Sequence, residues 1–188
     1  TSTSALELEE VPQRFLVVGG GYIGLELGTV YAAFCSQVTV VEMTGELLPG
    51  VDRDLTRPLV SRLKSQFQNI YLNTLVVSCE LKEKQIAVQF EGEVQTGNYD
   101  RILVAVGRKP NTVDMGLEFT GIKTDDKGFI QVDERFQTGE PSIFAIGDVI
   151  GGAMLAHKAS SEGKTVVDIL TGETLSAKIR SVPAVVFT

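Results

Sequence analysis

The spacing of apolar residues changes twice within the first forty positions. Arg14 to Val18 is a short, branched apolar run that stops at three glycines, which is typical of a buried parallel strand. Apolar residues then recur every three or four positions, so the pattern predicts a helix. The residues of its expected buried face are Ile23, Leu27, Val30, Tyr31 and Phe34. Residues 38–42 predict a second buried strand, and a strand, helix and strand within about 30 residues form a βαβ unit.

The rest of the chain continues the alternation of helix and strand. The predicted elements are, in order, a helix over 52–67, a hairpin over 70–90 that turns at 82–84, strands over 102–106, 129–132 and 143–146, and a helix over 155–170. Residues 1–10 show no period and predict a connector. The fold class that follows is α/β with a parallel sheet.

Composition excludes several classes of protein. Apolar residues make up 43% and charged residues 22% of the 188 positions, which is enough apolar material for a core. The net charge of −7 argues against nucleic acid as a partner. No apolar run approaches the roughly 20 residues that cross a bilayer, so we expect no membrane-spanning segment and no membrane as a partner. Two cysteines and one histidine are too few for a disulfide framework or a metal centre.

The strongest local signal is the glycine pattern of residues 19–24. Gly19 allows a tight turn after the strand, Gly21 lets a pyrophosphate approach the backbone, and Gly24 lets the helix pack against the sheet. The phosphates would lie at the positive end of the helix. A glycine-rich turn also arises for structural reasons alone. Because this turn follows an apolar strand and opens a helix, dinucleotide binding is favoured.

Glu42 lies at the end of the second strand, 18 residues beyond Gly24. An acid there can accept hydrogen bonds from both ribose hydroxyls and repels a 2′-phosphate. Residues 43–46 contain no base, so the sequence predicts NAD rather than NADP. The alternative is a solvated acid at the end of a strand.

A second acid, Asp148, follows Gly147 at the end of the predicted strand 143–146. Parallel α/β sheets bind ligands at this edge, and a helix begins a few residues later. A ligand there would meet a carboxylate and a helix N-terminus. A Gly-Asp pair is also an ordinary turn.

Five segments together resemble the dihydrolipoyl dehydrogenase family of FAD- and NAD-dependent disulfide oxidoreductases. They are residues 17–26 (VVGGGYIGLE), 40–43, 104–111 (VAVGRKPN), 138–148 and 154–159 (MLAHKA). The resemblance covers essentially the whole chain and identifies it as an internal fragment. It implies a Rossmann-like NAD-binding domain over 1–110, with βαβ units and an antiparallel β-meander. Part of a second, FAD-binding-type domain would follow over 111–176, and the start of an interface domain over 177–188.

The resemblance also implies the residues that bind each cofactor. The expected NAD-binding residues are Gly19, Gly20, Gly21, Tyr22, Ile23, Gly24, Leu25, Glu26, Glu42, Val76 and Gly107. Glu42 would bind the adenine ribose, Val76 would lie beside the adenine, and Gly107 would approach through its backbone. Asp148 would bind the ribityl chain of FAD. The segment expected along the flavin is Met154, Leu155, Ala156 and His157.

In the family, the parent enzyme oxidises dihydrolipoamide through a redox disulfide and FAD and reduces NAD. The implied partners are lipoyl domains of 2-oxoacid dehydrogenase complexes and a second subunit, in the cytoplasm or, in a eukaryote, the mitochondrial matrix. The family's Cys-x4-Cys pair, first FAD glycine motif and C-terminal His-Glu base do not occur in these residues. We therefore expect no catalytic residue here and no activity of this chain alone. Another disulfide reductase, or a non-catalytic NAD-binding module, are the alternatives.

Overall fold

The structure is a computed structural model that describes residues 1–173 and 181–187. It divides into two compact units, of which the first comprises residues 1–107 and the chain from residue 186 on. The second unit comprises residues 108–185. Residues 177–180 and 188 of the expected third domain lie outside the described residues. No helix in the described part of the chain is long and apolar enough to cross a membrane.

The first unit contains one parallel and one antiparallel sheet, which confirms the predicted α/β fold. The parallel sheet has the order β3-β2-β1-β7 and consists of β1 (Arg14–Val18), β2 (Gln37–Val41), β3 (Asn69–Tyr71) and β7 (Arg101–Val104). The antiparallel meander consists of β4 (Leu75–Lys82), β5 (Gln85–Glu91) and β6 (Thr96–Tyr99). The helices are α1 (Ser2–Ala5), α2 (Tyr22–Ala33) and α3 (Arg53–Gln66). Helix α1 forms where a connector was expected.

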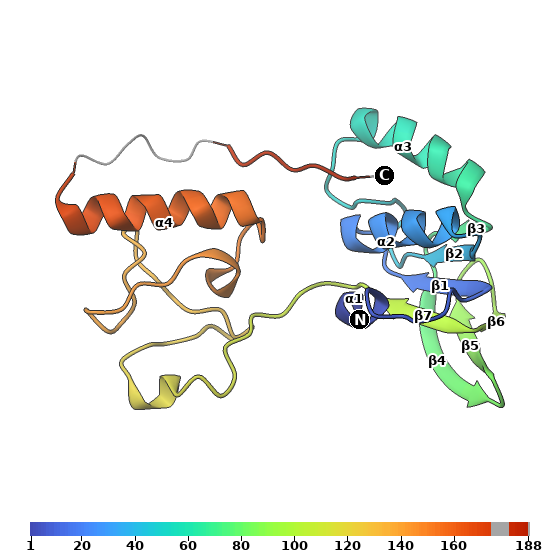
Figure 1. Cartoon of the computed structure of the whole chain (residues 1–188), viewed down its shortest axis with the longest axis horizontal. Coiled ribbons are helices and arrows are strands. Elements are labelled where there is room, and N and C mark those ends of the chain that lie inside the picture. Colours follow the sequence, from blue (N-terminus) through green and yellow to red (C-terminus); the bar gives the residue numbers. More distant parts are fainter. Residues whose placement is uncertain (174–180, 188) are drawn as a thin grey trace. The chain divides into compact units, whose positions relative to one another are not determined.

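The parallel sheet is buried on both faces. Helices α2 and α3 cover one face, and the meander lies on the other (Figure 1). Side chains alternate along β1 accordingly, because Phe15 and Val17 pack with the helices whereas Leu16 packs with the meander. Burial on both sides explains why these strands contain continuous apolar residues rather than an alternating pattern.

The predicted buried face of α2 is right for Tyr31 and Leu27 and wrong for Val30 and Phe34. The buried residues are Gly24, Leu25, Gly28 and Tyr31, whereas Val30 and Phe34 are about half exposed or more. Apolar residues occur on every side of this helix, so their spacing does not determine which side packs. The glycines do, because a Cβ at Gly28 would lie 3.1 Å from the ring of Phe67.

The second unit contains a long helix and little regular strand structure. Its elements are the 3₁₀ turns η1 (Leu117–Phe119) and η2 (Gly147–Ile150) and the helix α4 (Ala156–Thr171). The strands predicted over 129–132 and 143–146 are wrong, since the described residues there form only isolated bridges, at Ile130 and Phe144. A strand needs a hydrogen-bonded neighbour, and in the described residues these segments pair with single residues only.

Helix α2 ends in a left-handed turn at Cys35. Cys35 has a φ of 68°, and the N–H of Ser36 donates to the carbonyl of Tyr31 at 3.0 Å. The N–H of Cys35 donates to the carbonyl of Ala32, also at 3.0 Å, which completes a Schellman motif. Glycine is the usual residue at this position because a Cβ is strained in the left-handed region.

Replacing Cys35 with glycine should raise the free energy of unfolding by about 1 kcal/mol, because the left-handed conformation then costs no steric strain. Urea unfolding under reducing conditions measures the change. Cys35→Ala is the matched control, since it removes the thiol and keeps the Cβ. Equal stabilisation by both substitutions would show that the thiol, not the backbone conformation, is the source of the strain.

Candidate functional site

Three strand ends meet at Gly19, at the carboxyl edge of the parallel sheet. The N–H of Gly19 donates to the carbonyl of Val41 at the end of β2, at 2.9 Å. On the other side, a Cβ at Gly19 would lie 2.4 Å from the carbonyl oxygen of Ala105, just after β7. With a φ of 110° as well, this position accepts only glycine.

Gly24 and Gly21 differ in what surrounds them. A Cβ at Gly24 would lie 2.3 Å from the carbonyl oxygen of Gly19, so Gly24 is required by packing of α2 against the turn. A Cβ at Gly21 would meet nothing within 4 Å. Gly21 is the N-cap of α2 and no side chain caps it by a hydrogen bond. The first turn of α2 therefore presents N–H groups beside open space, which suits an anionic group.

Glu42 lies next to this turn and is 7% exposed. Its Oε2 accepts a hydrogen bond from the N–H of Gly20 at 2.7 Å. Its Oε1 accepts two, from the N–H of Thr44 at 2.8 Å and from the hydroxyl of Thr44 at 2.9 Å. The turn that exposes the helix N-terminus thus also fixes a carboxylate beside it, so the alternative of a solvated strand-end acid does not describe Glu42.

The remaining predicted NAD residues lie in different surroundings. Tyr22 and Ile23 belong to the first turn of α2, whereas Leu25 is fully buried in the helix-side core and can contribute only its backbone. Glu26 accepts a hydrogen bond from the N–H of Phe187 at 2.9 Å. The other two are Val76, which packs on the meander core, and Gly107, where a Cβ would meet nothing within 4 Å.

In the second unit, Asp148 forms an ion pair that the sequence did not suggest. Nη2 of Arg108 lies 2.8 Å from Oδ2 of Asp148, and Nη1 donates to the carbonyl of Met154 at 3.4 Å. Leu155 is the N-cap of α4 and makes no side-chain capping bond. Nε2 of His157 lies 2.7 Å from the carbonyl oxygen of Pro183. Arg108 therefore brings Asp148 and the segment before α4 together.

A buried ion pair on α4 fixes the turn that contains Asp148. Lys158 and Glu162 lie 3.0 Å apart, with side chains 10% and 6% exposed. Glu162 accepts from the N–H of Gly147 at 2.8 Å, and Lys158 donates to the carbonyls of Gly147 and Gly151 at 3.2 and 2.8 Å. Sequence reasoning missed both residues. Their spacing of four on a helix was the available signal, but it is also typical of exposed pairs.

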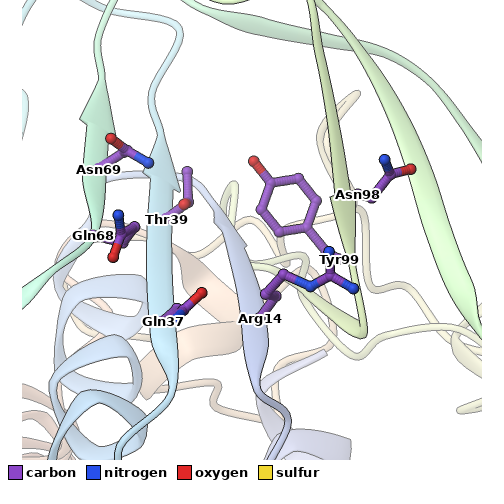
Figure 2. Close-up of a pocket in the computed structure, with 7 residues that line it drawn as sticks. All are labelled: Arg14, Gln37, Thr39, Gln68, Asn69, Asn98 and Tyr99. Carbon is purple, nitrogen blue, oxygen red and sulfur yellow. The ribbon is translucent and has the colours of Figure 1, made fainter.

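A polar pocket of about 170 Å³ lies at the opposite, amino edge of the parallel sheet (Figure 2). Its lining residues are Arg14, Gln37, Thr39, Gln68, Asn69, Asn98 and Tyr99. Burial raises the pKa of Tyr99, and Tyr71 raises it further, whereas Thr39 lowers it. Parallel α/β sheets bind ligands at the other edge, so this pocket is separate from the glycine turn. Residues 1–173 and 181–187 contain no group of acidic, histidine and cysteine side chains arranged to bind a metal.

Comparison with known proteins gives the family. The sequence profile described as pyridine nucleotide-disulphide oxidoreductase matches residues 1–163. The chain belongs to this family. Among curated members, dihydrolipoyl dehydrogenase of Geobacillus stearothermophilus is 45% identical over 99% of this chain, and that of Vibrio cholerae is 42% identical over all of it. The chain spans about 40% of the length of either relative.

Two solved structures have the same fold over this chain. LpdA from Mycobacterium tuberculosis matches 97% of the chain with a TM-score of 0.87 and 29% identity, over 40% of its own length. The HOCl-induced flavoprotein disulfide reductase RclA from Escherichia coli matches 92% with a TM-score of 0.84 and 34% identity, over 39% of its own length.

Replacing Glu162 with alanine should destabilise the second unit by about 3 kcal/mol, because the ammonium group of Lys158 is then buried without its partner. Hydrogen exchange of the amides of α4 measures the loss of protection. The control is Lys164→Ala, which removes an exposed charge of the same helix. The ion pair would be dispensable if α4 kept its protection in Glu162→Ala.

Proposed function

We propose that the carboxyl edge of the parallel sheet binds NAD(H). The observation that carries the proposal is the open space at Gly21, beside the uncapped first turn of α2 and next to the carboxylate of Glu42. A pyrophosphate carries negative charge and needs N–H donors, which this turn supplies. A ribose carries two hydroxyl donors and needs an acceptor, which Glu42 supplies. A dinucleotide carries a pyrophosphate and, beside it, the adenosine ribose, so one ligand can bind both the turn and Glu42.

The same carboxylate favours NAD over NADP. A 2′-phosphate would bring its charge against a carboxylate that is almost fully buried, where Coulomb repulsion is screened less than in water. Residues 43–46 offer no positive side chain to compensate. We therefore assign the predicted NAD residues 19–26 and 42 to this site. Val76 would lie beside the adenine, and Gly107 would approach the dinucleotide through its backbone.

The parent protein is proposed to be a dihydrolipoyl dehydrogenase, with a redox disulfide and FAD between dihydrolipoamide and NAD. The identities of 45% and 42% to two such enzymes support this activity. When bound, FAD supplies the two-electron carrier between the disulfide and the nicotinamide. In this chain, Asp148 and the uncapped N-terminus of α4 offer a ribityl acceptor and N–H donors, respectively. Lipoyl domains, a second subunit and a cytoplasmic or matrix location belong to the same proposal.

A second candidate is another flavoprotein disulfide reductase. The likeness to RclA, a flavoprotein disulfide reductase, favours it. These 188 residues do not distinguish the two candidates, because the expected redox thiol pair and His-Glu base are not among them. The sequence of the longer protein would distinguish the two through its thiol pair and its substrate-binding residues. A non-catalytic NAD-binding module remains the alternative if that thiol pair is absent.

Replacing Gly21 with alanine should weaken NADH binding strongly without unfolding the chain. Gly21 has a φ of −79° and open space at its Cβ, so alanine is tolerated, yet its methyl group occupies the position that a pyrophosphate needs. Titration calorimetry should show at least about a ten-fold loss of NADH affinity. An unchanged melting temperature is the control for folding. Full NADH affinity in Gly21→Ala would exclude the proposed phosphate position.

The unmodified chain should bind NADH more tightly than NADPH, and Glu42→Gln should narrow that preference by at least about ten-fold. Glutamine keeps the volume of the side chain but removes the charge that repels a 2′-phosphate. Calorimetric titration of both cofactors measures the ratio. Equal affinity of the unmodified chain for NADH and NADPH would contradict the role of Glu42.

A further inference from the structure

Thr44 makes more hydrogen bonds to Glu42 than any other described residue. Its N–H and its hydroxyl both donate to Oε1, at 2.8 and 2.9 Å, while Gly20 donates to Oε2 at 2.7 Å. The two oxygens of the carboxylate are therefore held separately, one by the glycine turn and one by Thr44. Rotation of the carboxylate about its last bond would break these contacts.

The hydroxyl of Thr44 has a second acceptor. The carbonyl oxygen of Glu46 lies 3.0 Å away, and a hydroxyl has one proton, so it donates to Glu42 or to Glu46 at any moment. The backbone of Thr44 is fixed independently, because its carbonyl accepts from the N–H of Asn73 at 3.0 Å. A substitution at Thr44 can thus remove the hydroxyl while the loop keeps its anchor.

Each oxygen of a carboxylate accepts about two hydrogen bonds, and this number sets how many further donors Glu42 can bind. In the structure, both bonds of Thr44 go to Oε1, whereas Oε2 has one bond from Gly20 and room for another. Both bonds of Thr44 therefore hold Oε1 in place, while Oε2 remains able to accept a ribose hydroxyl.

We propose that Thr44 is the positioning residue for ribose recognition, so that its hydroxyl sets how Glu42 accepts the diol of NAD(H). This inference rests on the proposed NAD(H) site. Thr44 does not touch the reacting part of the cofactor, and it acts through Glu42. Its effect is larger for NADH than for NADPH, because in NADPH a phosphate that the carboxylate repels replaces one of the two hydroxyl donors.

The test compares Thr44→Val and Thr44→Ser in the 188-residue chain, with NADH and NADPH as probes in calorimetric titrations. Valine keeps the branched shape and lacks the hydroxyl, so NADH affinity should fall about five-fold while NADPH affinity stays within about two-fold, as expected for the loss of one hydrogen bond. Serine keeps the hydroxyl and should restore the NADH preference. Thr56→Val is the matched control, because Thr56 is buried on α3 and its hydroxyl donates to the backbone carbonyl of Arg53.

Three outcomes overturn the inference. In the first, Thr44→Val keeps the full preference for NADH; in the second, Thr44→Ser is as impaired as Thr44→Val. If Thr44→Val fails to fold, judged by its melting curve, Thr44→Ala replaces it in the same comparison. The third outcome is a lack of NADH binding by the unmodified chain, which overturns the proposed function as well. Normal binding by the unmodified chain together with an unaffected Thr44→Val overturns only the role of Thr44.

Discussion

The approach of the backbone at Gly19 to two strand ends determines the geometry of the candidate site. Its N–H is bonded to the end of β2, and its Cα lies against the carbonyl of Ala105 after β7. Gly24 then packs directly on the carbonyl of Gly19, which fixes where α2 begins. A side chain at either glycine would push the helix away from the sheet. The open space at Gly21 exists because its two neighbours in the pattern are in close contact.

The same turn brings opposite electrostatic features together. The N-terminus of α2 favours negative charge, whereas the buried carboxylate of Glu42, bonded to Gly20, disfavours it. A single anion cannot satisfy both. A ligand that is anionic at one end and offers neutral hydroxyl donors at the other can, and this requirement is more restrictive than the glycine spacing alone. Thr44 adds to this restriction, because it fixes the acceptor without adding charge.

Local signals predicted the first unit well and the second less well. The β1 strand, the glycine turn and the β2 strand follow from short-range chemistry, so residues 14–42 were predictable. The packing face of α2 was predictable only in part, because apolar residues surround that helix. The strand predicted over 143–146 failed because apolar content alone does not supply a pairing partner. Glu42 and Thr44, like Lys158 and Glu162, are close in sequence, but their roles depend on further contacts with Gly20 and Gly147, which sequence spacing does not give.

The two predicted acids are held by different means, and this difference has consequences for each. Glu42 follows a strand of the parallel sheet, and its backbone pairs with Tyr71 and Thr74, so the sheet determines its position. Asp148 lies in the 3₁₀ turn η2, which is bonded to Lys158 and Glu162 of α4. A buried ion pair holds its geometry only while both partners remain. The position of Asp148 therefore depends on two side chains of one helix, whereas that of Glu42 depends on the backbone ladder of the sheet.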